Sequence, residues 1–423
     1  MSVWVFDRQE LSTRKVAPIT DKTMLEQIHQ IMRKDLIALK EASCTNVVEV
    51  LEILDDSKTA IAFTTERVVC SLSDILSRFH GIAEGRRSCE NFLETNGTLS
   101  EIDIGRGLLN IGEGLQYFHT VCKKLHASIS PESVVITSTG QWKICSFGLS
   151  LSFLGSDNQL AASPYFLRIM PNSHLMRLEP DLAYSSPELS AGGSSSPSVR
   201  YISPATDIYS LGILAYEVYR FCLKTAAEGR AFTPTVCVSN NSADYHAVAL
   251  EAMRSLDFSF LPHEIVPLIA SMLQADARQR PSIAEVIGHQ FFASGAMAVL
   301  KSIASLHTRD VGTQSSHLAA LSGQLSGFST RILERSVLPV ICGLCGSNPV
   351  LWVYALPLHE HINSRMAPGT YAVAAGQHIA NGLLGSAVVE SMLAFLKAHV
   401  FIQETFDAAF FTVSFSHRDH CML

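Results

Sequence analysis

The stretch 125–148 constrains the fold of this chain more than any other part of the sequence. It begins with a polar loop that contains a Pro-Glu pair, continues through two short β-forming runs joined by a tight turn, and ends in Phe-Gly. In chain order these parts are Leu125–Ser133, Val134-Val135-Ile136, Gly140, Trp142-Lys143-Ile144 and Phe147-Gly148. The pattern predicts a β-hairpin with one loop at each end.

Protein kinases have this layout, with His-Arg-Asp-Leu-x-x-x-Asn in the first loop and Asp-Phe-Gly in the second. The frame is present here, since His126, Phe147 and Gly148 occupy their kinase positions. The chemistry is missing, because serine replaces the catalytic Asp, the metal-binding Asn and the metal-binding Asp. The degenerate positions of the two loops are Ser128, Ser130, Ser133 and Ser146. The stretch resembles that of a pseudokinase.

Later motifs predict an intact large lobe. Ser186-Pro187-Glu188 is close to the Ala-Pro-Glu that ends a kinase activation segment, and residues 207–212 resemble the Asp-x-Trp-Ser-x-Gly of the central helix. Asp207 is expected to accept hydrogen bonds from the backbone of the first loop, and Arg280 is expected to pair with Glu188. A buried ion pair that lacks one partner is costly, so the presence of both residues favours a folded large lobe.

The N-terminal region predicts a strand, a helix and two more strands, the order of a kinase small lobe from its third strand onward. The strands are expected at 2–7, 47–54 and 59–65, and the helix at 20–40, with Thr20 or Asp21 as its cap. Trp4 aligns with the Lys of Val-Ala-Ile-Lys, and an indole supplies no positive charge, although it can fill the space of a phosphate. The helix Glu that pairs with this Lys aligns near Met32, where no carboxylate stands. Both ends of the Lys–Glu pair are therefore predicted to be lost.

The Gly-rich phosphate loop is absent because the chain starts at Met1, inside the motif. A small lobe without its first two strands is expected to leave an unpaired edge on a short sheet. An incomplete gene model or an internal start is therefore expected, and transcript sequencing upstream of Met1 tests it.

Residues 66–70 are predicted to form the hinge between the lobes. The glycines of the helix expected at 104–121 lie inside a helical pattern rather than after a strand, so they are a weak nucleotide-binding signal.

Composition excludes several classes of function. The net charge is −7 and 17% of the residues are charged, so no clustered basic face for nucleic acid is indicated. The first residues carry scattered charges and no apolar run of signal-peptide length, which argues against secretion. The ten cysteines have no disulfide spacing, and Cys342 and Cys345 are interpreted as buried side chains on a helix rather than as a redox or zinc pair. No metal or cofactor is predicted, with ATP as the alternative.

Two runs without Asp, Glu, Lys or Arg, 336–359 and 366–389, raise the question of a membrane span. The first run contains Pro339, Asn348 and Pro357, and the second contains Gln377, His378 and Asn381. Membrane spans are more uniformly apolar than this. Buried helices of a helical domain are favoured over a membrane span.

After residue 292 the composition changes to apolar helical segments with short breaks, which predicts the start of a HEAT-type α-solenoid. The predicted fold is an α+β, bilobal, protein-kinase-like domain whose small lobe lacks its first strands, followed by a solenoid fragment. We expect the partial small lobe at 1–70, the large lobe at 71–293 and the helical region at 294–423. That region is expected to be incomplete, because a solenoid needs several repeats to bury its faces. His417-Arg418-Asp419 spells the catalytic triplet, but no Asn follows at the required distance and the match is interpreted as coincidence.

A kinase-like domain with these substitutions that leads into a helical solenoid resembles the Scy-like pseudokinases, which are N-terminal-kinase-like proteins with HEAT repeats. The similarity covers residues 1–360 and is best at 104–148 and 204–292, and an aromatic residue also replaces the Lys in that family's opening strand. The branch linked with clathrin-coated vesicles is the most similar. The resemblance implies an adaptor in Golgi, endosomal and coat-dependent traffic. Its partners would be coat proteins of clathrin or adaptor type, and it would be cytoplasmic and peripheral on those membranes, without a transmembrane span.

The functional hypothesis is a catalytically inactive scaffold. A serine hydroxyl has no pKa near neutrality with which to act as a base, and it carries no charge for Mg²⁺. Two alternatives stay open. One is a nucleotide-binding switch or weakly active Ser/Thr protein kinase that holds nucleotide through the hinge backbone, and the other is a non-functional fragment of a truncated gene. Stabilisation of the fold by ATP separates the switch from the scaffold.

Overall fold

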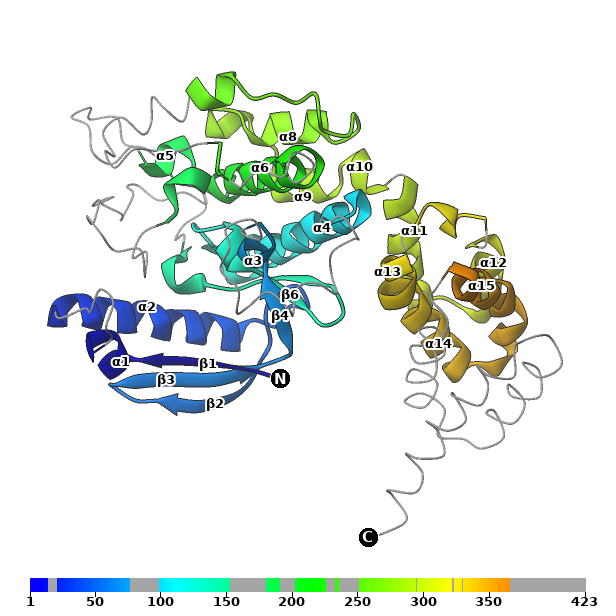
Figure 1. Ribbon diagram of the computed structural model, residues 1–423, viewed down its shortest axis with the longest axis horizontal. Coiled ribbons are helices and arrows are strands. Elements are labelled where there is room, and N and C mark those ends of the chain that lie inside the picture. Colours follow the sequence, from blue (N-terminus) through cyan, green and yellow to red (C-terminus); the bar gives the residue numbers. More distant parts are fainter. Residues whose placement is uncertain are drawn as a thin grey trace, which may run out of the picture. The chain divides into compact units, whose positions relative to one another are not determined.

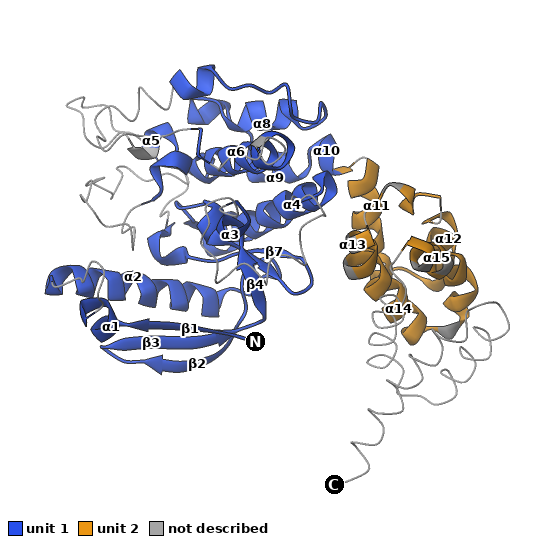
Figure 2. Cartoon of the chain, viewed as in Figure 1, with its two compact units in different colours: residues 1–292 blue, residues 293–423 orange. Residues whose placement is uncertain are grey.

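The computed structural model divides into two compact units, residues 1–292 and residues 293–423 (Figure 2). The residues that it describes are 1–13, 21–76, 99–152, 180–190, 202–225, 233–235, 251–293, 295–321, 323–328 and 330–365. The second charge-free run and the triplet at 417–419 lie outside these residues.

The small lobe of the first unit consists of a three-stranded antiparallel sheet covered on one face by a long helix (Figure 1). Its elements are β1 (Ser2–Asp7), α1 (Arg8–Thr13), α2 (Lys22–Glu41), β2 (Val50–Asp56) and β3 (Ala60–Thr65). Phe6 of β1 shares a buried apolar core with Ile28 and Leu36 of α2. The carboxylate of Asp21 caps α2 by accepting a hydrogen bond of 2.8 Å from the N–H of Thr23. The predicted order of strand, helix, strand and strand is confirmed, and the short helix α1 is an addition to it.

β1 lies at one edge of this sheet, whose strand order is β1-β3-β2. Its side chains alternate, so that Trp4 and Phe6 face α2 while Val3 and Val5 point to the opposite face. Val3 is 60% exposed and Val5 is 68% exposed. An edge position for the first strand is what the sequence predicted.

The large lobe is mainly helical and contains the expected hairpin. Its larger elements are β4 (Val68–Ser71), α3 (Leu72–Leu76), α4 (Glu101–Tyr117), β5 (Lys124–Leu125), β6 (Val134–Thr137), β7 (Trp142–Ile144), β8 (Leu151–Ser152), α5 (Pro187–Ser190), α6 (Ala205–Arg220), α8 (Val266–Met272), α9 (Ile283–Ile287) and α10 (Gln290–Ala293). β6 and β7 pair antiparallel around a turn in which Gly140 has a φ of 77°. β4 pairs with β6, so residues 68–70 of the predicted hinge form a strand rather than a free loop.

Glycines on α4 allow large side chains to pack directly on the helix backbone. A Cβ on Gly107 would stand 2.1 Å from the indole ring of Trp142, and a Cβ on Gly114 would stand 2.8 Å from Ile144. Both contacts join α4 to β7, the second strand of the hairpin. These glycines serve packing, which is consistent with their weak value as a nucleotide-binding signal.

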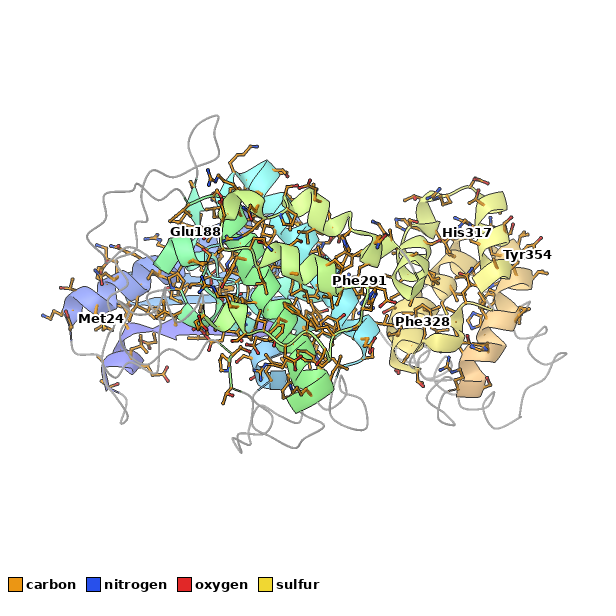
Figure 3. The ribbon with its side chains drawn as sticks, turned by 90° about the horizontal axis from the view of Figure 1, so that it is seen from above. Met24, Glu188, Phe291, His317, Phe328 and Tyr354 are labelled. Carbon is orange, nitrogen blue, oxygen red and sulfur yellow. The ribbon has the colours of Figure 1, made fainter. Side chains whose placement is uncertain are left out.

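The second unit is helical over the residues that the structure describes. Its α-helices are α11 (Gly295–Ala304), α12 (Val311–Leu321), α13 (Thr330–Ile332), α14 (Leu338–Ser347) and α15 (Trp352–Arg365). α15 packs against α12 and α14. Phe328, in the connection before α13, is 1% exposed, whereas Tyr354 on α15 is 40% exposed (Figure 3). The helical segments predicted after residue 292 are therefore present as far as Arg365, where the described part of this unit ends.

Cys342 and Cys345 both lie on α14, and both are buried. Burial raises the pKa of each thiol to about 12, so neither is a thiolate near neutral pH.

Among the described residues, no group of three His, Cys, Asp or Glu side chains could hold a metal ion. Within the same ranges, no single helix has both the length and the apolar character needed to cross a membrane.

We expect Gly107→Ala to lower the free energy of unfolding by about 1–3 kcal/mol, because the added methyl group would overlap the indole of Trp142, which is 2% exposed. Gly343→Ala on α14 is the control. Nothing lies within 4 Å of a Cβ at Gly343, and alanine is the better helix former, so this variant should gain about 0.5–1 kcal/mol. Urea denaturation of the full chain measures both. A Gly107→Ala protein as stable as the wild type would contradict the packing argument.

Candidate functional site

The carboxylate of Asp207, near the start of α6, holds the loop that precedes the hairpin. Asp207 is 0% exposed and accepts hydrogen bonds of 2.8 Å from the backbone N–H groups of His126 and Ala127. The Nε2 atom of His119 lies 2.9 Å from the same carboxylate. Burial alone would raise the pKa of this carboxyl group, but the hydrogen bond and charge of His119, together with His126, hold the pKa of Asp207 below its usual value. The bonds expected of Asp207 are thus present.

His126 links the two loops at the ends of the hairpin. Its Nε2 atom lies 2.8 Å from the carbonyl oxygen of Cys145, and its Nδ1 atom accepts a hydrogen bond of 3.3 Å from the N–H of Ser128. Because a carbonyl oxygen only accepts, Nε2 carries the ring proton, and Nδ1 carries none. Burial lowers the pKa of His126, which favours this neutral form. The ring is therefore a fixed bridge between the two loops.

One residue in each loop has a left-handed backbone, Ala127 with a φ of 61° and Ser146 with a φ of 67°. Such conformations cost roughly 1–3 kcal/mol for a residue other than glycine and persist where their surroundings hold them. The N–H of Ala127 is held by Asp207. Beside Ser146, the buried ring of Phe147 stacks on Phe118 with the ring centroids 4.0 Å apart.

The serines of the two loops differ in what their hydroxyl groups can reach. Ser133 is 2% exposed, and its Oγ atom donates to the carbonyl oxygen of Ser130 at 3.0 Å and accepts from the N–H of Ser130 at 2.9 Å. The hydroxyl of Ser133 therefore both donates to and accepts from the backbone of Ser130, within one turn. Ser146 is exposed and Ser128 is half-buried. None of the four side chains carries a charge.

The residues present do not fit the Mg²⁺ that protein kinases hold at this place. Kinases bind it through the Asp of Asp-Phe-Gly and the Asn of the catalytic loop, and Mg²⁺ favours carboxylate oxygens in octahedral geometry. Ser146 offers an uncharged hydroxyl, and the hydroxyl of Ser133 is committed to the backbone of Ser130.

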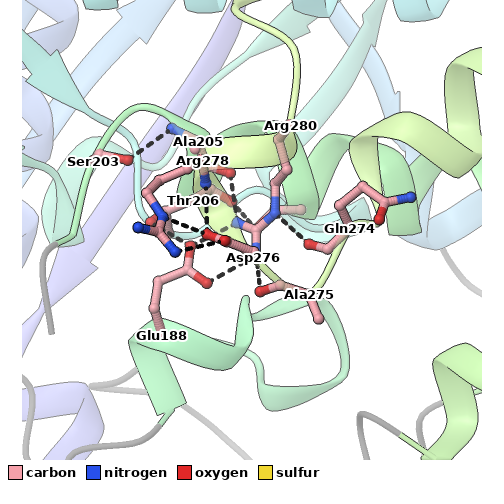
Figure 4. Close-up of polar contacts among 10 residues, drawn as sticks. Glu188, Ser203, Ala205, Thr206, Gln274, Ala275, Asp276, Arg278 and Arg280 are labelled. Carbon is pink, nitrogen blue, oxygen red and sulfur yellow. Dashed lines mark hydrogen bonds and ion pairs between the residues drawn. The ribbon is translucent and has the colours of Figure 1, made fainter. Parts of the chain in front are cut away.

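Glu188 and Arg280 form the expected ion pair, and it is nearly enclosed (Figure 4). Nη1 of Arg280 lies 2.6 Å from Oε1 of Glu188, and Nη2 lies 2.9 Å from Oε2, so the contact is bidentate. Nε of Arg280 donates to the carbonyl oxygen of Gln274 at 2.7 Å. The guanidinium also lies over the ring of Tyr209, 4.9 Å from its centroid. These bonds fix the end of the activation segment to the body of the large lobe.

Trp4, at the position of the kinase Lys, is half-buried on the side of the sheet that faces α2. Its ring lies parallel to that of Phe63, with the centroids 6.3 Å apart. Its indole Nε1 donates to Oγ1 of Thr65 at 2.8 Å. The side chain supplies a hydrogen-bond donor in place of a cation.

Asp35 of α2 is a carboxylate that the sequence alignment missed. Its Oδ1 atom accepts a hydrogen bond of 2.6 Å from the N–H of Phe147. Met32, to which the alignment assigned the position of the helix Glu, packs against the apolar core instead. The alignment found no carboxylate near Met32 and so missed Asp35, which lies three residues further along the helix and returns to nearly the same face. An acidic residue on the apolar stripe of a helix was the available signal.

Two further contacts dock α2 on the segment that follows Ser146. A Cβ on Gly148 would stand 2.7 Å from the carbonyl oxygen of Ile31, so only glycine allows this approach. Lys34 donates from Nζ to the carbonyl oxygen of Ser150. Burial, followed by the charge of Lys124, lowers the pKa of Lys34. α2 is thus joined to the Phe-Gly segment without the Lys–Glu pair.

The protein kinase domain model matches residues 7–292, about two thirds of the chain. The chain belongs to the protein kinase domain family. Its relatives include the protein kinase domain-containing protein ppk32 of Schizosaccharomyces pombe, 26% identical over 81% of this chain and 43% of that protein. SCY1-like protein 2 of Mus musculus is 24% identical over 84% of this chain and 36% of its own length. The protein kinase-like protein SCY1 of Saccharomyces cerevisiae is 22% identical over 81% and 41%.

These similarities support the Scy-like kinase family that the motifs indicated. The chain spans less than half the length of these relatives. The shared region includes the two loops in which the sequence predicts serines at the metal and base positions.

The bond between Asp35 and Phe147 predicts a pH-dependent stability. Part of the Asp35 residue reaches solvent, but its carboxyl group is closely surrounded, and this burial raises its pKa to about 6 while the Phe147 hydrogen bond opposes the shift. A carboxyl group with a higher pKa folded than unfolded makes the folded state less stable once it ionises. The wild type should therefore lose stability as the pH rises from about 4 to 6.

Two variants separate the charge from the hydrogen bond. Asp35→Asn keeps an oxygen acceptor without a charge, so it should exceed the wild type in stability at pH 7.5, with the difference shrinking toward pH 4. Asp35→Ala leaves the N–H of Phe147 without its acceptor and should be roughly 1–3 kcal/mol less stable than Asp35→Asn at every pH. Urea denaturation across this pH range measures both effects. A difference between the wild type and Asp35→Asn that does not change with pH would contradict the assignment.

Proposed function

We propose that the chain is a catalytically inactive, kinase-like scaffold or adaptor in intracellular membrane traffic. One observation carries the first part: the contacts of Asp207 and of the Glu188–Arg280 pair are complete, while serines stand at the base and metal positions. A kinase domain that keeps its structural framework but lacks the charged groups of phosphoryl transfer can still offer a surface to a binding partner.

Phosphoryl transfer depends on positioning and on compensation of developing charge. Loss of general acid–base catalysis alone typically costs ~10²–10⁴-fold in rate. Here the metal ligands and the lysine are replaced as well, and within the described residues no trio of acidic, His or Cys side chains supplies a substitute metal site. These losses act on the same transition state, so they support inactivity rather than a slow kinase.

The adaptor part rests on the family resemblance. We propose that the helical second unit begins a HEAT-type solenoid, in which paired helices expose extended surfaces to partners. The packing of α15 against both α12 and α14 is consistent with such pairs. The proposed partners are coat proteins of clathrin or adaptor type. The proposed location is cytoplasmic, peripheral on Golgi, endosomal or coated-vesicle membranes.

A nucleotide-binding switch, or a weakly active Ser/Thr kinase, is the second candidate. It is favoured by the docking of α2 on Phe147 through Asp35, since an ordered helix in this position is what a nucleotide-bound kinase requires.

Inactivity predicts that purified full-length protein transfers no phosphate from Mg-ATP to itself or to a generic protein substrate. Any signal should be the same in the wild type and in Ser146→Ala, because a co-purifying kinase does not depend on Ser146. Radiolabelled phosphate transfer measures this. Robust transfer by the wild type that Ser146→Ala abolishes would overturn the proposal.

The traffic proposal predicts that tagged full-length chain, expressed in cells, is enriched on coated vesicles relative to cytosol. High salt should release it, because peripheral contacts between proteins are weakened by charge screening. Immunoblotting of gradient fractions before and after the wash measures both steps, with an unrelated tagged protein as the control. Equal recovery of the chain and the control protein in the vesicle fraction would count against an adaptor.

A further inference from the structure

The segment 65–68, which connects β3 of the small lobe to β4 of the large lobe, is hydrogen-bonded by side chains of the small lobe itself. A purine base presents a donor and an acceptor side by side on one edge, so backbone N–H and C=O groups that face a ligand suit it. Nucleotide binding through the hinge backbone would need such groups to be free here. Their bonding partners therefore decide whether a base can be held.

Ser2 takes both polar groups of Val68. The N–H of Val68 donates to Oγ of Ser2 at 2.9 Å, and Oγ of Ser2 donates to the carbonyl oxygen of Val68 at 3.2 Å. A hydroxyl has one proton to donate and lone pairs to accept with, so a single serine satisfies both groups. In a strand the N–H and C=O of one residue point to the same side, which is the pairing that a base edge would use.

Trp4 and Thr65 take the next acceptor. The indole Nε1 of Trp4 donates to Oγ1 of Thr65 at 2.8 Å, and this hydroxyl donates to the carbonyl oxygen of Glu66 at 3.0 Å. An indole N–H can only donate, so the direction of this relay is fixed. Thr65 is 0% exposed, which leaves its hydroxyl no alternative partner in water.

The strand register explains why these side chains meet the segment. Ser2 of β1 lies opposite Thr65 of β3, and Trp4 lies opposite Phe63, so Ser2 and Trp4 share one face of the sheet. β3 ends at Thr65, and the chain continues past the end of β1 into β4. The side chains of Ser2 and Trp4 therefore lie against the backbone that leaves β3.

The same segment is anchored on its other side. Lys143 of β7 forms an ion pair of 2.5 Å with Glu66, and the N–H of Glu49 donates to the same carboxylate at 3.0 Å. The carbonyl oxygen of Arg67 accepts from the N–H of Ser138 at 3.2 Å. A ligand could not gain the groups held by Ser2 and Thr65 through a simple shift of the segment, because these bonds hold it in place.

We propose that Ser2 and Trp4 close the purine-binding edge of this kinase domain from within, so that the chain binds no adenine nucleotide and its lobes are joined without one. The inference concerns base binding alone, and it does not depend on the missing metal ligands or on membrane traffic. It also disfavours the nucleotide-binding switch on grounds separate from the serines of the two loops.

The test is binding of ADP and ATP to the full chain, with and without Mg²⁺, by isothermal titration calorimetry and by the shift in Tm. The wild type should show no saturable binding and no rise in Tm at millimolar nucleotide, since a ligand that binds the folded state must raise its stability. Ser2→Ala frees the N–H and C=O of Val68 and should bind ADP saturably, at least about tenfold more tightly than the weakest binding that the wild-type titration would detect. Ser2→Ala combined with Trp4→Ala should bind more tightly again.

Ser12→Ala is the matched control, because it removes a small-lobe hydroxyl that bonds only within its own helix turn, and it should behave as the wild type. Trp4→Phe keeps an aromatic six-membered ring but removes the Nε1 donor and the five-membered ring that carries it. It supplies a milder variant than Trp4→Ala if Ser2→Ala does not fold, and it should gain a measurable part of the binding. Saturable micromolar binding of ADP by the wild type would overturn the inference, as would folded Ser2→Ala and Trp4→Phe proteins that gain none. Nucleotide binding without phosphate transfer would sink this inference while leaving catalytic inactivity standing.

Discussion

One buried carboxylate, that of Asp207, sets the geometry on which the first unit depends. Removing a charge from water is costly unless hydrogen bonds replace the hydration, and here two backbone N–H groups and His119 do so. Those N–H groups belong to His126 and Ala127, so α6 fixes the loop before the hairpin. His126 then fixes the carbonyl of Cys145 after the hairpin. None of these bonds involves the position of the catalytic Asp, so the loop geometry survives without phosphoryl chemistry.

Hydrogen bonds within the chain connect parts of the domain that an active kinase connects through a lysine or a bound nucleotide. Asp35 ties α2 to the backbone of Phe147 instead of to a lysine, and Ser2 ties β1 to Val68 where a base would bind. Each bond joins two parts of the protein directly. A surface that is ordered before it meets a partner loses less conformational entropy on binding, which is a useful property in a scaffold.

Much of the large-lobe site could be predicted from the order of the motifs, because residues close together within one motif have nearly fixed relative positions. The role of Asp207 and the pairing of Glu188 with Arg280 could be predicted since each motif carries its own local geometry. Asp35 could not be predicted in the same way, because counting along a helix from a distant strand leaves an uncertainty of about one turn, and that separates it from Met32. The bond of Ser2 to Val68 was also out of reach. It depends on the register of β1 against β3, strands that are far apart in the sequence, and on where β3 ends.

The two serines predicted to stand at metal positions, Ser133 and Ser146, have different surroundings. Ser146 is exposed and has a left-handed backbone, a conformation that Asp and Asn adopt more readily than most residues, so a carboxylate would suit the backbone as it stands. Ser133 is different, because its hydroxyl closes a turn with Ser130 by donating and accepting at once, in a site with almost no exposure. A longer amide that pointed toward a metal would leave the N–H of Ser130 without an acceptor, at a cost that buried donors rarely bear. The hydroxyl of Ser133 therefore completes the loop, and Asn at this position would act against the turn with Ser130, whereas Asp at Ser146 would not.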